Sequence, residues 1–207
     1  MFRKLFSPDS GLMITLGQIS DVIFMSLFYL VCSIPIFTLG ASTPALYDAT
    51  YRGVRQYIPK SFFRYFEVFK GNFRAGIVPG LIFAACMVGY LLGIRELWNA
   101  FALGKLGTVA FAALALLAMV VLGILQLCLP MLSRFDMPTG QLLKNTVLLG
   151  LSHMPLTLLL GIIHAIGIYC SIFYVFPIFF APGLCALLGS FCIEPMFKPF
   201  LPQQEES

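Results

Sequence analysis

Residues 145–193 read NTVLLGLSHMPLTLLLGIIHAIGIYCSIFYVFPIFFAPGLCALLGSFCI and contain no Asp, Glu, Lys or Arg. As one straight helix these 49 residues would extend about 74 Å, at a rise of about 1.5 Å per residue. That length is more than twice the roughly 30 Å hydrocarbon core of a bilayer. The stretch must therefore fold back once, and we expect the turn near residues 164–171. It predicts two membrane-spanning helices, at about 145–165 and 171–193.

Three further stretches also lack charged side chains: residues 22–47, 75–94 and 106–133. Each can cross a membrane once, because about 20 apolar residues in a helix suffice. The corresponding spans are expected at about residues 20–40, 75–95 and 106–130. The sequence thus predicts an all-α integral membrane protein, a single domain over residues 1–207 with about five transmembrane helices. The alternative, a soluble all-α protein, is disfavoured because only 11% of the residues are charged and the mean hydropathy is +0.93.

Positive side chains are distributed unevenly among the segments between these spans. With five crossings, the loop after the first span, the loop after the third and the C-terminal tail share one side. That side has nine of the 13 Lys and Arg residues. Because short loops rich in Lys and Arg stay in the cytoplasm, we expect the C-terminus inside and the N-terminus outside. Arg3 and Lys4 then lie on the outer side, against the general trend.

The first cytoplasmic loop, residues 42–74, contains a pattern typical of an amphipathic interfacial helix. Four phenylalanines recur at spacings of four, three and four residues, which places them on one helix face: Phe62, Phe66, Phe69 and Phe73. Such a helix can lie in the membrane surface, with its rings among acyl chains and its cations near anionic lipid. The alternative is that it docks onto a partner subunit. The expected lipid or partner contacts are Arg64, Phe66, Phe69, Lys70, Phe73 and Arg74.

A corner between two helices is predicted where the first span meets this loop. The sequence IPIFTLGASTPALY, residues 34–47, collects small and hydroxyl residues at the inner face: Thr38, Gly40, Ser42, Thr43 and Pro44. Gly40 suits the left-handed conformation common just past a helix end. Thr43 followed by Pro44 is typical of an N-cap and a first helical turn. We expect the hydroxyls to satisfy backbone groups, and an anion held by the exposed N–H groups is the alternative.

Few polar side chains lie within the predicted spans. Gln126, near the inner end of the third span, is expected to hydrogen-bond a neighbouring helix. His153 and His164 are 11 residues apart in the sequence, which corresponds to about 16 Å along a helix axis. They cannot share one metal ion, and we favour a structural role for each over a proton relay.

The last span contains prolines, which interrupt helices by removing backbone hydrogen bonds. Irregular backbone within a bilayer persists where protein or a wet cavity satisfies it. One interpretation is therefore a cavity between spans four and five, and simple packing kinks are the other. The candidate cavity residues are His153, Pro155, Tyr174, Pro177 and Pro182.

Small residues elsewhere in the spans are expected to serve packing. Ala85, Gly89 and Gly93 form a stripe at spacing four that suits close helix contact. All six cysteines lie in the uncharged stretches and form no C-x-x-C pair. We therefore expect them to pack as small apolar residues rather than to bind zinc or form a disulfide framework.

A weak internal similarity relates two parts of the chain. Residues 69–77, FKGNFRAGI, resemble residues 142–150, LLKNTVLLG, and residues 129–135, LPMLSRF, resemble residues 194–200, EPMFKPF. Each copy would be an inner-face elbow, an outward helix and a returning helix, which is a parallel repeat. Convergent chemistry at the membrane interface is the alternative.

No catalytic pattern is present in the sequence. It lacks H-E-x-x-H, G-x-S-x-G and a Walker loop, and no pair of carboxylates lies within a predicted span. We therefore expect no enzymatic activity and no cofactor. The net charge of +4 is too modest to suggest nucleic acid.

Three motifs together resemble a known family: IPIFTLGASTPALY, FFRYFEVFKGNFRAG and LPMLSRFDM, in this order. They are similar to the bacterial YesL-like proteins, small integral membrane proteins with a domain of unknown function. The resemblance implies a bacterial cell (inner) membrane location and a genetic association with carbohydrate-uptake ABC transporters, but no catalytic residue. The leading hypothesis is a non-enzymatic accessory component of such a transporter, in contact with its permease subunits. The alternative is a stand-alone small-solute permease or channel.

Overall fold

The computed structural model describes residues 11–56, 61–174 and 176–200, and these ranges contain helices and turns but no strand. The α-helices are α2 (Gly11–Ser33), α3 (Leu39–Thr50), α4 (Ser61–Ala102), α5 (Thr108–Met131), α6 (Thr139–Ser152), α7 (Met154–Phe173) and α8 (Ala181–Phe197). Short 3-10 turns η1, η3 and η4 occupy Ile36–Thr38, Phe176–Phe179 and Lys198–Phe200, and a π-helical turn, η2, occupies Tyr51–Arg55. The predicted all-α fold class is confirmed.

By length and composition, three helices in the described part of the chain are able to cross a membrane: Phe62–Ala102, Thr108–Met131 and Met154–Phe173. Of the other helices, α2 has 23 residues and includes the apolar segment Gly17–Ser33. Helix α8 has 17 residues, which corresponds to about 26 Å. Three described helices are thus long and apolar enough to cross a membrane. The count of five crossings stays a prediction.

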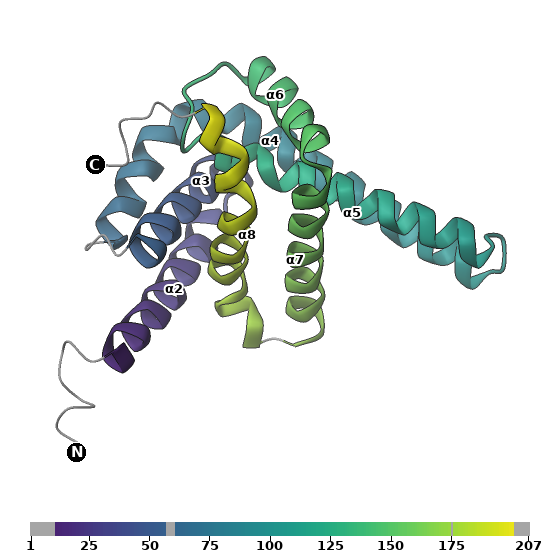
Figure 1. The fold of residues 1–207 in the computed structure, drawn as a ribbon, viewed down its shortest axis with the longest axis horizontal. Coiled ribbons are helices and arrows are strands. Elements are labelled where there is room, and N and C mark those ends of the chain that lie inside the picture. Colours follow the sequence, from purple (N-terminus) through teal and green to yellow (C-terminus); the bar gives the residue numbers. More distant parts are fainter. Residues whose placement is uncertain (1–10, 57–60, 175, 201–207) are drawn as a thin grey trace.

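Helices α4 and α5 form a long antiparallel hairpin (Figure 1). The start of α4 and the end of α5 pack within the bundle, where α4 contacts α3 and α5 contacts α6 and α7. The far half of the hairpin diverges from α2, α7 and α8 and extends away from them. The chain thus consists of a packed helical bundle and a projecting arm.

The interfacial helix expected within the loop of residues 42–74 is not a separate element. Residues 39–50 form α3, and η2 follows directly. Residues 61–74 are the first turns of α4, which continues without interruption to Ala102. Gly71 alone does not end a helix, because one glycine costs only about 1 kcal/mol relative to alanine.

The corner after α2 begins earlier in the chain than expected. Helix α2 ends at Ser33, and α3 starts at Leu39, so Thr43 and Pro44 lie inside α3. The predicted N-cap at Thr43 is therefore wrong. Pro35, which fixes its own backbone and disfavours helix in the residue before it, accounts for the earlier break.

Hydroxyl groups still form hydrogen bonds at this corner, as predicted. The Oγ1 of Thr38 donates to the carbonyl oxygens of Cys32 and Pro35. The Cys32 carbonyl belongs to the last turn of α2, whose carbonyl groups have no donor within the helix. The hydroxyls of Ser33 and Ser42 are 2.9 Å apart and share a hydrogen bond. These contacts fix the direction in which α3 leaves α2.

Glycines allow α3 and α4 to cross at backbone contact. A Cβ atom on Gly40 would overlap the carbonyl of Gly76, and one on Gly80 would overlap the backbone of Gly40. The role of Gly40 is thus close approach of two helices, not the left-handed turn that we expected. Gly123 and Gly161 allow a similar crossing of α5 and α7.

The stripe predicted for packing does not pack within this chain. Gly89 and Gly93 face open space, since a Cβ atom on either would meet nothing within 4 Å, and Ala85 is exposed. Gly89 and Gly93 therefore lie on a face of α4 that no other described helix approaches.

The long uncharged stretch folds back later than predicted. The helix expected at 145–165 is broken at His153, where α6 ends and α7 begins. Pro155 stands in the first turn of α7, a position that needs no backbone donor. The described residues between the last two helices are 174 and 176–180, so the chain turns there and not at 164–171.

Pro177 and Pro182 accordingly mark a turn and a helix start. Pro177 lies in η3, and Pro182 lies in the first turn of α8, so neither kinks a continuous helix. Ser26 of α2 supplies a hydrogen-bond acceptor to the first turn of α8. Its Oγ accepts a hydrogen bond of 2.9 Å from the amide of Gly183.

The two predicted repeats differ in the structure. The first elbow is continuous with its helix in α4, whereas the second is split into α6 and α7. The two Pro-Met sequences behave alike, since Met131 and Met196 are both buried in the main apolar core. Phe135 and Phe197, which follow them, pack edge to face at 5.5 Å.

Candidate functional site

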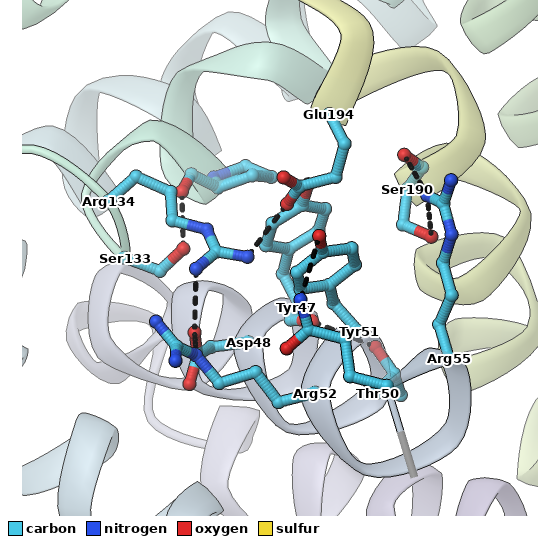
Figure 2. A network of polar contacts seen from close by, with 12 residues as sticks. Tyr47, Asp48, Thr50, Tyr51, Arg52, Arg55, Ser133, Arg134, Ser190 and Glu194 are labelled. Carbon is cyan, nitrogen blue, oxygen red and sulfur yellow. Dashed lines mark hydrogen bonds and ion pairs between the residues drawn. The ribbon is translucent and has the colours of Figure 1, made fainter. Parts of the chain in front are cut away.

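A set of polar and charged side chains is gathered where α3, η2, the segment after α5 and α8 meet (Figure 2). We call it the polar cluster. Its members are Tyr47, Asp48, Tyr51, Arg52, Arg55, Arg64, Arg134, Ser190 and Glu194.

Asp48 is fully buried and is the central acid of the polar cluster. Its Oδ1 accepts a hydrogen bond of 3.0 Å from Nε of Arg52, and its Oδ2 accepts one of 2.7 Å from Nε of Arg64. The Nη1 of Arg134 lies 3.7 Å from Oδ1. Three guanidinium groups from separate segments therefore converge on one carboxylate, where an unpaired charge would be strongly destabilising.

Glu194 is the second acid of the polar cluster. Its Oε1 accepts hydrogen bonds of 2.8 Å from Nη2 of Arg134 and of 2.8 Å from the hydroxyl of Tyr47. The guanidinium of Arg134 also stacks over the ring of Tyr51, 4.6 Å from its centre. Arg134 thus connects Asp48 to Glu194 and joins α3, the end of α5 and α8 (Figure 2).

Arg55 connects η2 to α8 at the edge of the polar cluster. Its Nη1 donates to the carbonyl oxygen of Ser190 at 2.9 Å. Its guanidinium lies 4.2 Å from the centre of the Phe191 ring, a cation–π contact. These contacts tie the π-helical turn to the middle of α8.

The environment of the polar cluster shifts the pKa values of several of its members. Burial, together with Glu194 beside the phenol, raises the pKa of Tyr47 well above its ordinary value. Burial and Glu194 also raise the pKa of Tyr51. Burial disfavours the charged form of Arg134, but Glu194 and Asp48 outweigh it and raise the pKa of that guanidinium. Tyr47 therefore stays a neutral donor and Arg134 stays a cation.

The polar cluster has four arginines and two acids. Its ion pairs join separate segments of the chain. No three His, Cys, Asp or Glu side chains within the described ranges lie close enough to hold a metal ion. The Nε of Arg134 is buried without a hydrogen-bond partner in the described structure. The arrangement fixes the three segments predicted to share one side of the membrane against one another.

The sequence prediction missed the centre of this cluster. Asp48, Arg134 and Glu194 were not expected to act together. The signal was nevertheless present, because each is the first charged residue after one of the uncharged stretches. Such residues lie at the same depth whenever their spans end at the same face.

A cavity of about 610 Å³ lies beside the polar cluster, within the bundle. All the longer helices except α6 line it, and the lining is mostly apolar, including Leu46, Phe83, Met87 and Ile168. The ring of Tyr47 also lines it, so this residue faces the cavity with its ring and the polar cluster with its hydroxyl.

Of the candidate cavity residues, Pro182 lines this cavity. His153, Pro155, Tyr174 and Pro177 are outside its lining. These four lie at the break between α6 and α7 or in the turn before α8.

Among the polar side chains that line the cavity, Thr43, Gln126 and His164 have hydrogen-bonding capacity left over. The Oγ1 of Thr43 is buried without a partner. Gln126 makes no hydrogen bond within the described ranges, although we expected it to reach a neighbouring helix. His164 uses Nδ1 for a hydrogen bond of 3.0 Å with the carbonyl of Leu160, which leaves Nε2.

The predicted lipid or partner contacts fall into two groups. Arg64 belongs to the polar cluster, and Phe66 and Phe69 are half-buried against α2 and α3. Lys70, Phe73 and Arg74 are exposed on the surface of α4. Phe62 and Phe63, at the start of α4, are also exposed.

The fold and these sites define a helical protein of membrane type, with several helices long and apolar enough to cross a bilayer. Residues 22–94 match the model of a family described as "Protein of unknown function, DUF624". The match covers the second half of α2, all of α3 and η2, and α4 as far as Ile94. No curated protein and no solved structure matches the chain.

Proposed function

We propose that this protein is a non-enzymatic accessory component of a carbohydrate-uptake ABC transporter in a bacterial inner membrane. The projecting α4–α5 hairpin is the observation that supports an interaction role. Within the described ranges, the tip of this hairpin packs on itself through the rings of Trp98, Phe101 and Phe111. Both of its helices are therefore free to contact membrane helices of a partner, and Val109 is 85% exposed.

A second surface supports the same role at the other end of α4. We call it the basic–aromatic surface, and it consists of Phe62, Phe63, Lys70, Phe73 and Arg74. Neither Lys70 nor Arg74 forms an ion pair within the described ranges. Such a surface suits anionic lipid or an acidic face of a permease subunit.

Affinity purification from membranes in mild detergent tests the proposal. The tagged wild type should recover permease subunits of a carbohydrate transporter. Lys70→Glu with Arg74→Glu should reduce that recovery by about tenfold, because like charges now meet across the contact. Arg64 is not a suitable target, since its loss would disturb the polar cluster.

The control is Lys144→Glu, at an exposed position on α6. It reverses a positive charge outside both proposed contact surfaces, so the permease recovery should remain at the wild-type level. Absence of any permease subunit from the wild-type purification contradicts the proposal, as does equal recovery with the Lys70 and Arg74 variant.

The second candidate function, a stand-alone small-solute permease, is supported by the 610 Å³ cavity. Reconstituted liposomes separate the two functions. Sugar or ion flux through the purified protein alone would favour the permease and would argue against a purely accessory role.

A further inference from the structure

The cavity has the chemistry of a site for a lipid-like molecule. Its volume of about 610 Å³ lies within the range of about 300–1,000 Å³ typical of small-molecule sites. None of its described lining residues is Asp, Glu, Lys or Arg. A charged ligand would therefore lose its hydration without gaining an ion pair, which disfavours it strongly.

The rim of the cavity faces an apolar surface. Ile36, Val88 and Ile172 line the cavity and are also among the most exposed apolar side chains, with Ile172 at 71%. In a membrane such a rim opens to acyl chains rather than to water, so a ligand reaches the cavity from the bilayer.

Three unpartnered groups define the polar part of the ligand. The Nδ1 of His164 faces a carbonyl, which can only accept, so Nδ1 carries the proton and Nε2 is an acceptor. The Gln126 amide and the Thr43 hydroxyl can each donate and accept. A ligand hydroxyl can donate to the Nε2 of His164, and Gln126 and Thr43 add further hydrogen-bonding groups to the same lining.

We propose that this cavity binds an uncharged single-chain amphiphile from the bilayer, one long apolar chain that ends in a hydroxyl. A sugar fits less well, because each of its several hydroxyls would need a partner in a mostly apolar lining. This inference does not depend on the accessory role, and it argues against a sugar as cargo of the cavity.

Photolabelling tests the inference. The wild-type protein in phosphatidylcholine nanodiscs is irradiated with a diazirine-bearing hexadecanol, and the labelled peptides are located by mass spectrometry. The hexadecanol should label peptides of α7 and α8 about tenfold more than the matching hexadecyl sulfate, whose charge the cavity cannot pair. Equal labelling by the sulfate overturns the inference.

A matched pair of variants locates the site. Ala84 lines the cavity, whereas Ala85 points away and is exposed. Ala84→Phe fills the cavity and should remove the α7 and α8 label, while Ala85→Phe should leave it unchanged. Equal labelling of the two variants overturns the inference.

Two further measurements do not depend on how Ala84→Phe folds. In the wild type, excess unlabelled hexadecanol must reduce the label on α7 and α8, and failure to compete overturns the inference. Gln126→Leu should weaken competition by unlabelled hexadecanol by about tenfold, the effect of one lost hydrogen bond, whereas excess maltose should not compete. Competition by maltose would instead assign the cavity to a sugar.

Discussion

The phenol of Tyr47 donates a hydrogen bond of 2.8 Å to the carboxylate of Glu194, 147 residues later in the chain. The same oxygen of Glu194 accepts a hydrogen bond of 2.8 Å from Arg134. Since the ring of Tyr47 lines the cavity, this one residue joins the apolar interior of the bundle to the polar cluster. The packing of α3 against α8 and the pairing of buried charges therefore depend on each other.

Asp48→Asn tests the polar cluster. The substitution keeps the shape of the side chain but leaves Arg52, Arg64 and Arg134 without their shared anion. We expect the free energy of unfolding to fall by about 3 kcal/mol, as when a buried ion pair loses one partner. Thermal unfolding of the purified protein in detergent measures the change.

The control for this prediction is Glu67→Gln. The side chain of Glu67 is 71% accessible, and it is the exposed ion-pair partner of Arg64. An exposed pair contributes less than about 1 kcal/mol. A loss of stability as large in Glu67→Gln as in Asp48→Asn would show that the buried carboxylate has no special role.

Gly76→Ala tests the crossing of α3 and α4. The added Cβ atom would overlap the carbonyl of Gly40, so the two helices must move apart. We expect a loss of about 1–3 kcal/mol in the free energy of unfolding, the usual effect of overpacking. Gly89→Ala on the same helix meets nothing within 4 Å and should be neutral or slightly stabilising. Equal effects of the two changes would contradict the close crossing.

Alkaline pH tests the protonation of Tyr47. Its pKa and that of Tyr51 are raised in the folded state, above the ordinary value of about 10. The stabilisation is therefore fully present below about pH 10 and is lost as the pH rises through the folded pKa values, by up to about 1.4 kcal/mol per pH unit for the buried Tyr47. The partly exposed Tyr51 contributes less, because solvent screens its interactions. Stability measured from pH 8 to pH 11.5 should fall above pH 10, and less steeply in Tyr47→Phe. An unchanged slope in Tyr47→Phe would rule out its contribution.

Ser26→Ala tests the contact of α2 with the start of α8. The Ser26 hydroxyl accepts the hydrogen bond from the amide of Gly183 and donates to the carbonyl of Val22, so its loss leaves a buried donor unpaired. We expect a decrease of about 1–2 kcal/mol in the free energy of unfolding. Ser152→Ala, whose hydroxyl is exposed and bonds only within α6, is the matched control and should change stability by less than about 0.5 kcal/mol. Similar losses in both variants would refute the inter-helix role of Ser26.

The distribution of charge predicted the fold class well. Charged residues absent over long stretches indicate apolar helices, and this signal correctly gave an all-helical chain. The residues that end three of these stretches, Asp48, Arg134 and Glu194, lie together in the structure. With five crossings, the segments that contain these three residues lie on one side of the membrane. That placement agrees with their contact in the structure.

The turns within the uncharged stretches could not be placed from the sequence. No charge marks where residues 145–193 fold back, and a proline can kink a helix, begin one or stand in a turn. Pro177 and Pro182 take the last two roles. The same ambiguity applied to Thr43 and Pro44, which read as a helix start but lie inside α3.

The candidate site depended on contacts that no local pattern contains. Gly40 and Gly76 matter because their helices cross, and the stripe at Gly89 has the same composition but no neighbour. Similarly, His164 lines the cavity while His153 breaks a helix. Residue type alone does not distinguish these positions, because the distinction arises from the packing of distant segments.

The central claim is that the chain crosses the membrane so that the segments joined by the polar cluster share one side. Single cysteines at exposed Lys70, Lys144 and Lys105 test it most directly, with a membrane-impermeant thiol reagent applied to intact and to lysed cells. Cysteines at positions 70 and 144 should react only after lysis, whereas a cysteine at position 105 should react in intact cells. Labelling of positions 70 and 144 from opposite sides, or of position 105 from the same side as both, would contradict the account.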